Sequence, residues 1–167
     1  MSEMEYPKFS VLMSLYLKEK PEYLNEALKS VINQTVKPNE IVIVYDGPIT
    51  TELKSVVEQY VSNNPGLIKI IDNPENKGLG LALADGVPQC TYELIARMDT
   101  DDICRKDRFE KQLEEFVKDP RLDICGSHIL EFEEKEENIV ARRRVPLVDR
   151  DIKEYQKRRD GFNHMSV

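Results

Sequence analysis

The stretch FSVLMSLYL, residues 9–17, is an apolar run interrupted only by serine. Without alternation between polar and apolar residues, such a run is typical of a strand buried on both faces, as in a parallel sheet. Pro21 follows a short polar stretch, where proline favours the first turn of a helix. Apolar residues then recur with helical spacing at Leu24, Ala27, Leu28, Val31 and Ile32. This region therefore predicts a buried strand followed by an amphipathic helix.

The same alternation continues to residue 133. Further strands are predicted at 40–46, 67–72, 92–99 and 122–133, and further helices at 51–61, 79–87 and 105–119. Strands that alternate with helices of this length favour right-handed crossovers. The sequence therefore predicts an α/β fold with a mostly parallel sheet and helices on both faces. We expect one domain, 1–167, with its core in about 7–133.

Beyond residue 138 the pattern weakens. A strand is expected within 138–147 and a polar helix at 149–159. The chain then stops in GFNHMSV, which resembles the start of another ordered segment, whereas a natural terminus is usually polar and frayed. We therefore expect the chain to be a truncated part of a longer fold.

Charge argues against a role in binding nucleic acid. Lys plus Arg number 24 and Asp plus Glu number 31, giving a formal net charge of −7, whereas nucleic-acid binders normally carry a basic excess. Segment 142–159 is nevertheless basic, with eight basic and three acidic residues, and 131–137 is acidic. These segments are either solvated surface or, for 142–159, a basic face for an anionic acceptor or a membrane surface.

Cysteine usage and hydropathy bear on the location of the protein. Cys90, Cys104 and Cys125 have no CxxC spacing, which indicates neither a disulfide framework nor a zinc site and fits a reducing cytoplasm. The sequence contains no signal peptide and no apolar run near the ~18 residues of a membrane helix. A cytoplasmic protein is expected, with peripheral contact at the inner face of the membrane left open.

Three aspartates, Asp99, Asp101 and Asp102, directly follow the predicted strand at 92–99. In open parallel α/β sheets, ligands bind beyond the carboxyl ends of the strands. Carboxylates that face one space repel each other unless a cation neutralises them, and oxygen ligands suit Mg²⁺ or Mn²⁺. The spacing therefore predicts a metal site for phosphate-bearing ligands. The alternatives are that Asp102 caps the next helix, or that all three are solvated.

Asp46 and Gly47 stand at the end of the predicted strand at 40–46, and we expect this strand to be a neighbour of the one that precedes the aspartates. The Asp46 carboxylate would accept a hydrogen bond from a base N–H or a ribose hydroxyl, and Gly47 would allow close approach of a ligand. The alternative is a simple turn-forming pair.

Three further residues are candidates for ligand contact. Tyr16 offers a flat face for stacking a base, or else fills the core. Gly78 would allow a ligand to approach the backbone beside a helix N-terminus, which suits anionic groups. Lys77 would assist there, or be solvated. Arg108, on the predicted helix after the aspartates, is expected to pair with one of their carboxylates.

Six stretches in this order resemble family 2 glycosyltransferases of the GT-A fold: FSVLMSLY, LNEALKSVINQT, EIVIVYDG, NKGLGLALADG, ELIARMDTDDI and DRFEKQLEEF. The resemblance runs from about residue 7 to 166. It implies a Rossmann-like fold and metal-dependent, inverting transfer of a sugar from a nucleotide diphosphate, by family habit UDP. The acceptor would be a hydroxyl of a saccharide or glycolipid, as in polysaccharide biosynthesis.

The resemblance also implies residue roles. Tyr16 would stack on the donor base, and Asp46 would bind the base or ribose. Asp99 and Asp101 would form the DxD motif and hold the sugar or ribose and the Mn²⁺ or Mg²⁺ ion, with Asp102 as an additional ligand. A general base would deprotonate the acceptor hydroxyl.

The sequence departs from the family pattern in two important places. Tyr45 stands at the first position of the usual acidic pair, and nothing in 103–167 matches the general base, which is expected beyond residue 167. The chain would thus be the N-terminal, donor-binding part, with 134–167 the incomplete start of an acceptor-side region. The rivals are a nucleotidyltransferase, a phosphoryl-accepting receiver domain and a non-catalytic nucleotide-binding module. The first is disfavoured because LYLKEKPEYL lacks a glycine-rich loop, and the second because no acidic pair follows the first strand.

Overall fold

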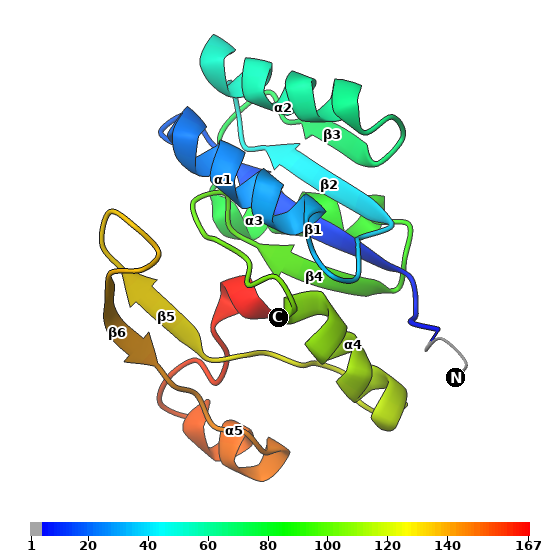
Figure 1. Cartoon of the computed structure of the whole chain (residues 1–167), viewed down its shortest axis with the longest axis vertical. Helices are drawn as coiled ribbons and strands as arrows, with labels where there is room; N and C mark the ends of the chain where they lie inside the picture. The colour runs from blue at the N-terminus through cyan, green and yellow to red at the C-terminus, as the bar shows by residue number, and fades with distance from the viewer. Residues whose placement is uncertain (1–4) are drawn as a thin grey trace. The chain divides into compact units, whose positions relative to one another are not determined.

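The structure is a computed structural model that describes residues 5–167. The chain divides into two compact units, Met1–Arg121 and Leu122–Val167. Each unit has its own sheet, as Figure 1 shows. The prediction that 1–167 acts as one functional domain stays a prediction.

A four-stranded parallel sheet forms the centre of the first unit. Its strands are β1 (Phe9–Leu15), β2 (Glu40–Tyr45), β3 (Ile68–Asp72) and β4 (Leu94–Met98), in the order β3-β2-β1-β4. The chain steps outward from β1 to β3 and then returns to the other side of β1. The predicted α/β fold with a mostly parallel sheet is confirmed. Our expectation that the strands before Asp46 and Asp99 are neighbours is wrong, because β1 pairs with both and separates them.

Helices cover both faces of this sheet. Alternate residues of β1 point to opposite faces, so that Val11 and Met13 join one core and Leu12 joins another. The first core is completed by α1 (Pro21–Ile32), α2 (Thr51–Asn63) and α4 (Arg108–Lys118), and the second by α3 (Leu79–Gly86). A 3₁₀ turn, η1 (Val87–Gln89), follows α3. The three-layer arrangement leaves the carboxyl ends of the strands free for loops.

Close packing sets the position of α3. A Cβ added at Gly86 would lie 2.5 Å from Leu12 Cδ1 and 2.8 Å from Val44 Cγ2. A side chain at this position would therefore force Leu12 and Val44, or α3 itself, to shift. On the opposite face, the rings of Phe9 and Phe109 meet edge to face with centroids 5.0 Å apart, which joins α4 to β1.

The second unit contains β5 (Ile129–Phe132), β6 (Ile139–Arg143), α5 (Asp149–Tyr155) and the 3₁₀ turn η2 (His164–Ser166). Our expectation of a strand over all of 122–133 is wrong. Only 129–132 is extended in a ladder, and it pairs antiparallel with β6 rather than joining the parallel sheet. A local turn, in which Glu133 N donates to Asn138 O over 3.1 Å, closes this hairpin. Such a local pairing has a low entropic cost.

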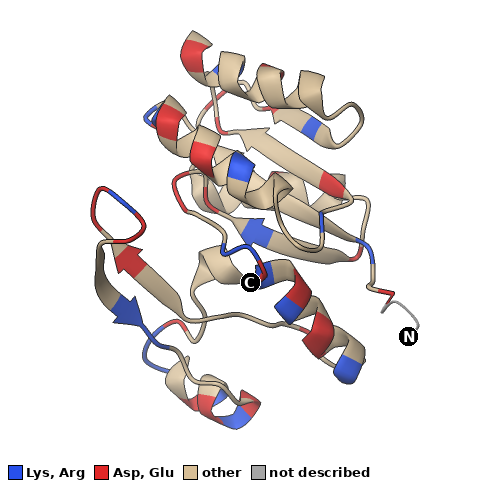
Figure 2. Cartoon of the chain, viewed as in Figure 1, with Lys and Arg blue, Asp and Glu red and all other residues tan. Residues whose placement is uncertain are grey.

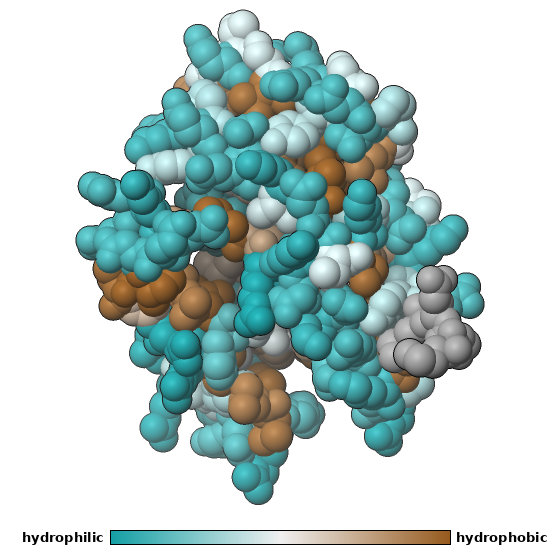
Figure 3. All heavy atoms as spheres, viewed as in Figure 1, coloured by the Kyte–Doolittle hydropathy of each residue, from teal (hydrophilic) through white to brown (hydrophobic). Residues whose placement is uncertain are grey.

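The surface of the chain is mainly hydrophilic on the face drawn in Figure 3, with hydrophobic residues in separate groups. Among residues 5–167, no helix is both long enough and apolar enough to cross a membrane.

Candidate functional site

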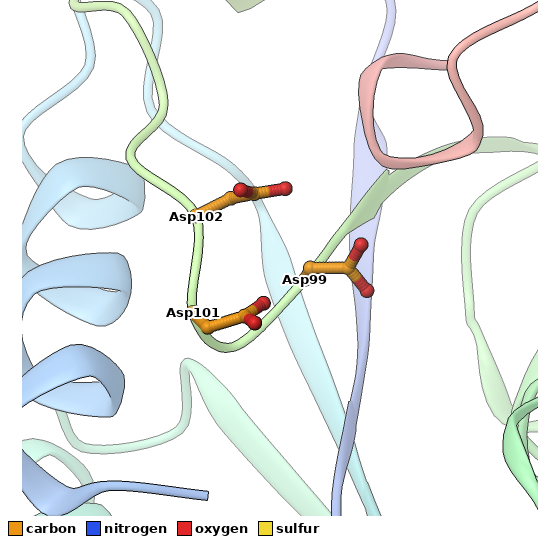
Figure 4. Close-up of side chains that lie close together, drawn as sticks. All are labelled: Asp99, Asp101 and Asp102. Carbon is orange, nitrogen blue, oxygen red and sulfur yellow. The ribbon is translucent and has the colours of Figure 1, made fainter. Parts of the chain in front are cut away.

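The loop after β4 brings Asp99, Asp101 and Asp102 together, and we call these three residues the acidic cluster. One carboxylate oxygen of each lies within 4.8 Å of those of the other two. In Figure 4, Asp101 and Asp102 extend from the same side of the loop toward Asp99. Asp101 is exposed, and Asp99 and Asp102 are half-buried. This is the geometry expected of ligands to one cation.

Burial and the charges of its neighbours both act on Asp102. Burial, and after it the charges of Asp99 and Asp101, raise the pKa of Asp102 from 3.8 to about 6, against the opposing charges of Arg97 and Arg108. A divalent cation would relieve the repulsion, and three carboxylates are suitable ligands for Mg²⁺ or Mn²⁺. The residues therefore fit the predicted metal.

Our alternative that Asp102 caps the next helix is wrong. α4 begins at Arg108, three residues later than the predicted start, and Asp107 occupies its N-cap position. Asp102 therefore lies in the loop, where its carboxylate belongs to the acidic cluster.

A buried arginine balances part of this charge. Arg97 is the only basic residue of β4, visible as the blue segment of that strand in Figure 2. Its Nη1 forms an ion pair with Oδ1 of Asp99, and the two side chains are 8% and 19% exposed. Its Nε and Nη2 are buried without a hydrogen-bond partner in the described part of the chain. One buried positive charge, that of Arg97, therefore contacts the acidic cluster through Asp99.

Arg108 supports this arrangement from α4. Its Nη2 donates to the backbone oxygen of Arg97 over 3.0 Å, and its Nε donates to Gln112 Oε1 over 2.9 Å. The charge of Arg108 also opposes the rise in the pKa of Asp102.

The second strand end is organised differently, and we call it the β2 corner: Asp46, Gly47, Lys77 and Gly78. Asp46 is 3% exposed. Its Oδ1 accepts a hydrogen bond from the backbone N–H of Lys77 over 2.7 Å, and its Oδ2 accepts one from that of Gly78 over 3.0 Å. Asn76 Nδ2 donates to the backbone oxygen of Asp46 over 3.0 Å. Asp46 therefore fixes the loop after β3, a role that the sequence did not indicate.

Gly47 is required at this corner for steric reasons. Its φ is +81°, and an added Cβ would lie 2.5 Å from the backbone nitrogen of Asn76. The close approach is therefore to the protein's own loop. Gly78 stands at the N-cap position of α3 with a φ of +88°. This backbone conformation favours glycine over other residues.

The remaining candidates are partly accounted for by contacts within the protein. Lys77 Nζ lies 3.2 Å from Asp85 Oδ2, which also accepts a hydrogen bond from Asn73 Nδ2 over 3.1 Å. Tyr16 is 43% exposed and follows β1, which lies between β2 and β4. Its ring therefore does not fill the core. Tyr45 is buried in the core, and burial, together with the charges of Asp72 and Glu58, raises its pKa to about 12.

Sequence reasoning missed Arg97 and Glu19. Arg97 had a signal, because a charged residue inside the apolar strand LIARM requires a partner. Glu19 had none: its contact with Thr100 spans 81 positions of the chain.

Comparisons with known proteins identify the family of the chain. The model of the family described as glycosyl transferase family 2 matches residues 10–167. An uncharacterized glycosyltransferase of Haemophilus influenzae is 45% identical over 160 residues, covering 96% of this chain and 59% of the relative. An Escherichia coli protein named UDP-Gal:alpha-D-GlcNAc-diphosphoundecaprenol beta-1,3-galactosyltransferase is 40% identical, covering 96% of this chain and 58% of the relative. The chain thus spans a little over half the length of these relatives.

Solved structures support the fold. S. aureus TarS gives a TM-score of 0.57 at 26% identity over 66% of this chain and 20% of TarS. The mannosyltransferase PcManGT from Pyrobaculum calidifontis, solved with GDP-Man and Mn²⁺, gives 0.61 at 21% identity over 76% of this chain and 36% of its own, a likeness of fold alone. The sheet order, the acidic loop after β4 and the family match over almost the whole chain lead to one conclusion: the protein belongs to glycosyl transferase family 2 and has the GT-A fold.

Proposed function

We propose that the chain is the donor-binding part of a metal-dependent, inverting glycosyltransferase. The reaction moves a sugar from a nucleotide diphosphate to an acceptor hydroxyl. The observation that carries the proposal is the acidic cluster, three carboxylates within 4.8 Å of one another at the carboxyl end of β4. A structural cap or a set of dispersed surface charges would not need all three to converge.

Within this proposal the acidic cluster holds Mn²⁺ or Mg²⁺. Asp101 and Asp102 supply oxygen ligands to the ion, and Asp99, restrained by Arg97, contacts the ion and the sugar or ribose. The bound cation supplies Lewis-acid chemistry by neutralising negative charge on the departing diphosphate. The raised pKa of Asp102 supports the assignment, because burial and then the charges of Asp99 and Asp101 disfavour its charged form, which a bound cation would stabilise.

The nucleoside part of the donor is assigned to Tyr16 and the β2 corner. Tyr16 is exposed at the end of β1, where its ring is available for stacking on a base. Asp46 uses both oxygens on backbone N–H groups, yet a carboxylate has about four lone-pair sites and retains the capacity to accept a hydrogen bond from base or ribose. Lys77 and Gly78 line the same corner.

The relatives support a proposal for the donor and acceptor classes. The name of the Escherichia coli relative specifies UDP-Gal and a GlcNAc-diphosphoundecaprenol acceptor. At 40% identity this favours a UDP-sugar and a saccharide acceptor on a lipid carrier for the present chain. Such an acceptor would bring the protein to a membrane surface.

Thermal unfolding in the presence of nucleotides tests the proposal. UDP, GDP, CDP and dTDP would each be added with Mn²⁺ or with EDTA. Because a ligand that binds only the folded state stabilises it, UDP at one hundred times its Kd would add about 2.7 kcal/mol and raise the Tm by several degrees. We expect this shift only with Mn²⁺.

Two matched variants complete the experiment. Asp101→Ala should abolish the shift. Asp107→Ala should retain it, because Asp107 lies in the same loop but pairs with Arg105 outside the acidic cluster. No shift with any nucleotide in the wild type, or an equal shift in EDTA, would contradict a metal-dependent donor site.

A further inference from the structure

The loops after β1 and β4 are joined by a hydrogen bond between side chains. Thr100 Oγ1 donates to Glu19 Oε2 over 2.8 Å. The same hydroxyl lies 3.3 Å from the backbone oxygen of Ser14, but it has one proton, and the shorter contact to a carboxylate is the stronger. The bond therefore links two segments that only the sheet brings together.

Each end of this link is attached to a proposed ligand contact. Thr100 is 3% exposed and stands between Asp99 and Asp101, the two residues of the DxD motif. Glu19 N donates to the backbone oxygen of Tyr16 over 3.1 Å, which closes the turn that carries the tyrosine. Glu19 Oε1 also accepts a hydrogen bond from Lys20 N over 2.8 Å. The carboxylate of Glu19 is thus fixed at both oxygens.

The topology makes this location important. β1 and β4 are adjacent parallel strands, and β1 is the strand at which the order of the sheet reverses. In open α/β sheets, ligands bind at the carboxyl ends of strands where the order reverses. A ligand there must contact both loops together, so their separation must match the length of the ligand.

We propose that Glu19 is a positioning residue that sets the loop of Tyr16 in register with the acidic cluster through Thr100. This inference rests on the proposed function. Glu19 contacts neither base nor metal; it holds the two halves of the donor site at the spacing that a nucleoside diphosphate with its cation requires. Removing the link should weaken ligands that span both halves and spare ligands that occupy only one.

Three probes separate these cases. Uridine occupies the base half alone, Mn²⁺ without nucleotide occupies the acidic cluster alone, and UDP with Mn²⁺ spans both. Uridine binding would be followed by NMR titration, Mn²⁺ by electron paramagnetic resonance and UDP with Mn²⁺ by calorimetry. In Glu19→Ala we expect the affinity for UDP with Mn²⁺ to fall roughly tenfold, as for loss of a hydrogen bond to a charged group. The affinities for uridine and for Mn²⁺ alone should change less than about twofold.

Variants at both ends test whether the bond itself is responsible. Thr100→Val removes the hydroxyl with little change in shape and should reproduce the loss, whereas Thr100→Ser and Glu19→Gln retain a donor and an acceptor and should restore most of the affinity. The double variant of Glu19→Ala and Thr100→Val should be no worse than either single variant, because both remove the same interaction. Glu22→Ala, an exposed acidic change in the first turn of α1, is the control.

The outcomes are distinguishable. An equal loss for all three probes, or additive losses in the double variant, would overturn the positioning role. Failure of the wild type to bind any of UDP, GDP, CDP and dTDP with Mn²⁺ would instead overturn the proposed function. A melting curve for each variant identifies any that fails to fold. If Glu19→Ala or Thr100→Val fails to fold, Thr100→Ser and Glu19→Gln keep the test valid.

Discussion

The β2 corner and the acidic cluster both stand at the carboxyl ends of strands, yet their carboxylates are in opposite situations. The Asp46 carboxylate is buried and accepts hydrogen bonds from two backbone N–H groups, so the protein itself supplies its partners. In the acidic cluster, three carboxylates converge, and Asp99 forms an ion pair with Arg97. The comparison shows that an aspartate at the end of a strand can be held by backbone N–H groups, as Asp46 is, or can face other carboxylates, as in the acidic cluster. The hydrogen-bond partners distinguish the two cases.

The largest expected effect on stability comes from breaking the β2 corner. Asp46→Ala leaves the N–H groups of Lys77 and Gly78 without their acceptor at a partly buried corner, and an unpaired group there costs about 1–3 kcal/mol. We expect a loss of about 3 kcal/mol in the free energy of unfolding, measured by urea denaturation.

The matched control for this change is Asp72→Ala at the end of β3. Asp72 is exposed and should change stability by less than about 0.5 kcal/mol. Equal effects of the two changes would mean that the β2 corner is no anchor.

A smaller effect is expected from removing Arg97. Breaking a buried ion pair typically costs about 3–5 kcal/mol because one charge is left uncompensated. Here Arg97→Met also removes two buried nitrogens that lack partners, so we expect a net loss of about 2 kcal/mol. The variant should also gain more stability from Mn²⁺ than the wild type, because the cation would replace the missing charge.

Thermal unfolding with Mn²⁺ and with EDTA checks this expectation. Arg105→Met is the control, since Arg105 pairs with Asp107 at the surface. The same gain from Mn²⁺ in Arg97→Met and in the wild type would show that Arg97 does not compensate the acidic cluster.

The smallest effect concerns pH. The raised pKa of Asp102, about 6, means that the folded state binds more protons than the unfolded state between pH 4 and 6. Asp102 therefore destabilises the metal-free protein above pH 6, and this effect disappears as the pH falls toward 4. In EDTA, Asp102→Asn should be more stable than the wild type at pH 7.5, because it removes the ionised carboxyl. We expect a gain of only about 1 kcal/mol, because solvent screens a half-buried carboxyl.

Urea denaturation of both proteins at several pH values measures this difference. The advantage of Asp102→Asn should shrink toward pH 4. A difference that stays constant from pH 7.5 to pH 4 would argue that Asp102 ionises normally in the folded state.

The strands of the parallel sheet were predicted well because the pattern that identifies each strand lies within a short stretch of sequence. Apolar runs such as FSVLMSLYL identify buried strands, and all four strands of the parallel sheet were found within a few residues. The order of the strands was not predictable in this way, and two strands expected to be neighbours are separated by β1. The strand predicted at 122–133 is longer than the observed β5 (Ile129–Phe132). Its apolar residues also did not indicate that it pairs with β6 and not with the parallel sheet.

The acidic cluster was predictable because its three members are adjacent in the chain. The contacts of Asp46 with the loop after β3 and of Glu19 with Thr100 were not, because they join residues that only the folded sheet brings together. Sequence spacing thus located the three carboxylates of the acidic cluster and missed the contacts made across the sheet.

The most direct test of the central claim is a titration of Mn²⁺ in the presence of UDP, followed by electron paramagnetic resonance. The acidic cluster as a metal site predicts one bound Mn²⁺ per chain in the wild type and in Asp107→Asn, and at least a tenfold weaker affinity in Asp101→Asn, on the order of the loss of one charged ligand. Equal Mn²⁺ affinity in Asp101→Asn and the wild type would contradict the claim.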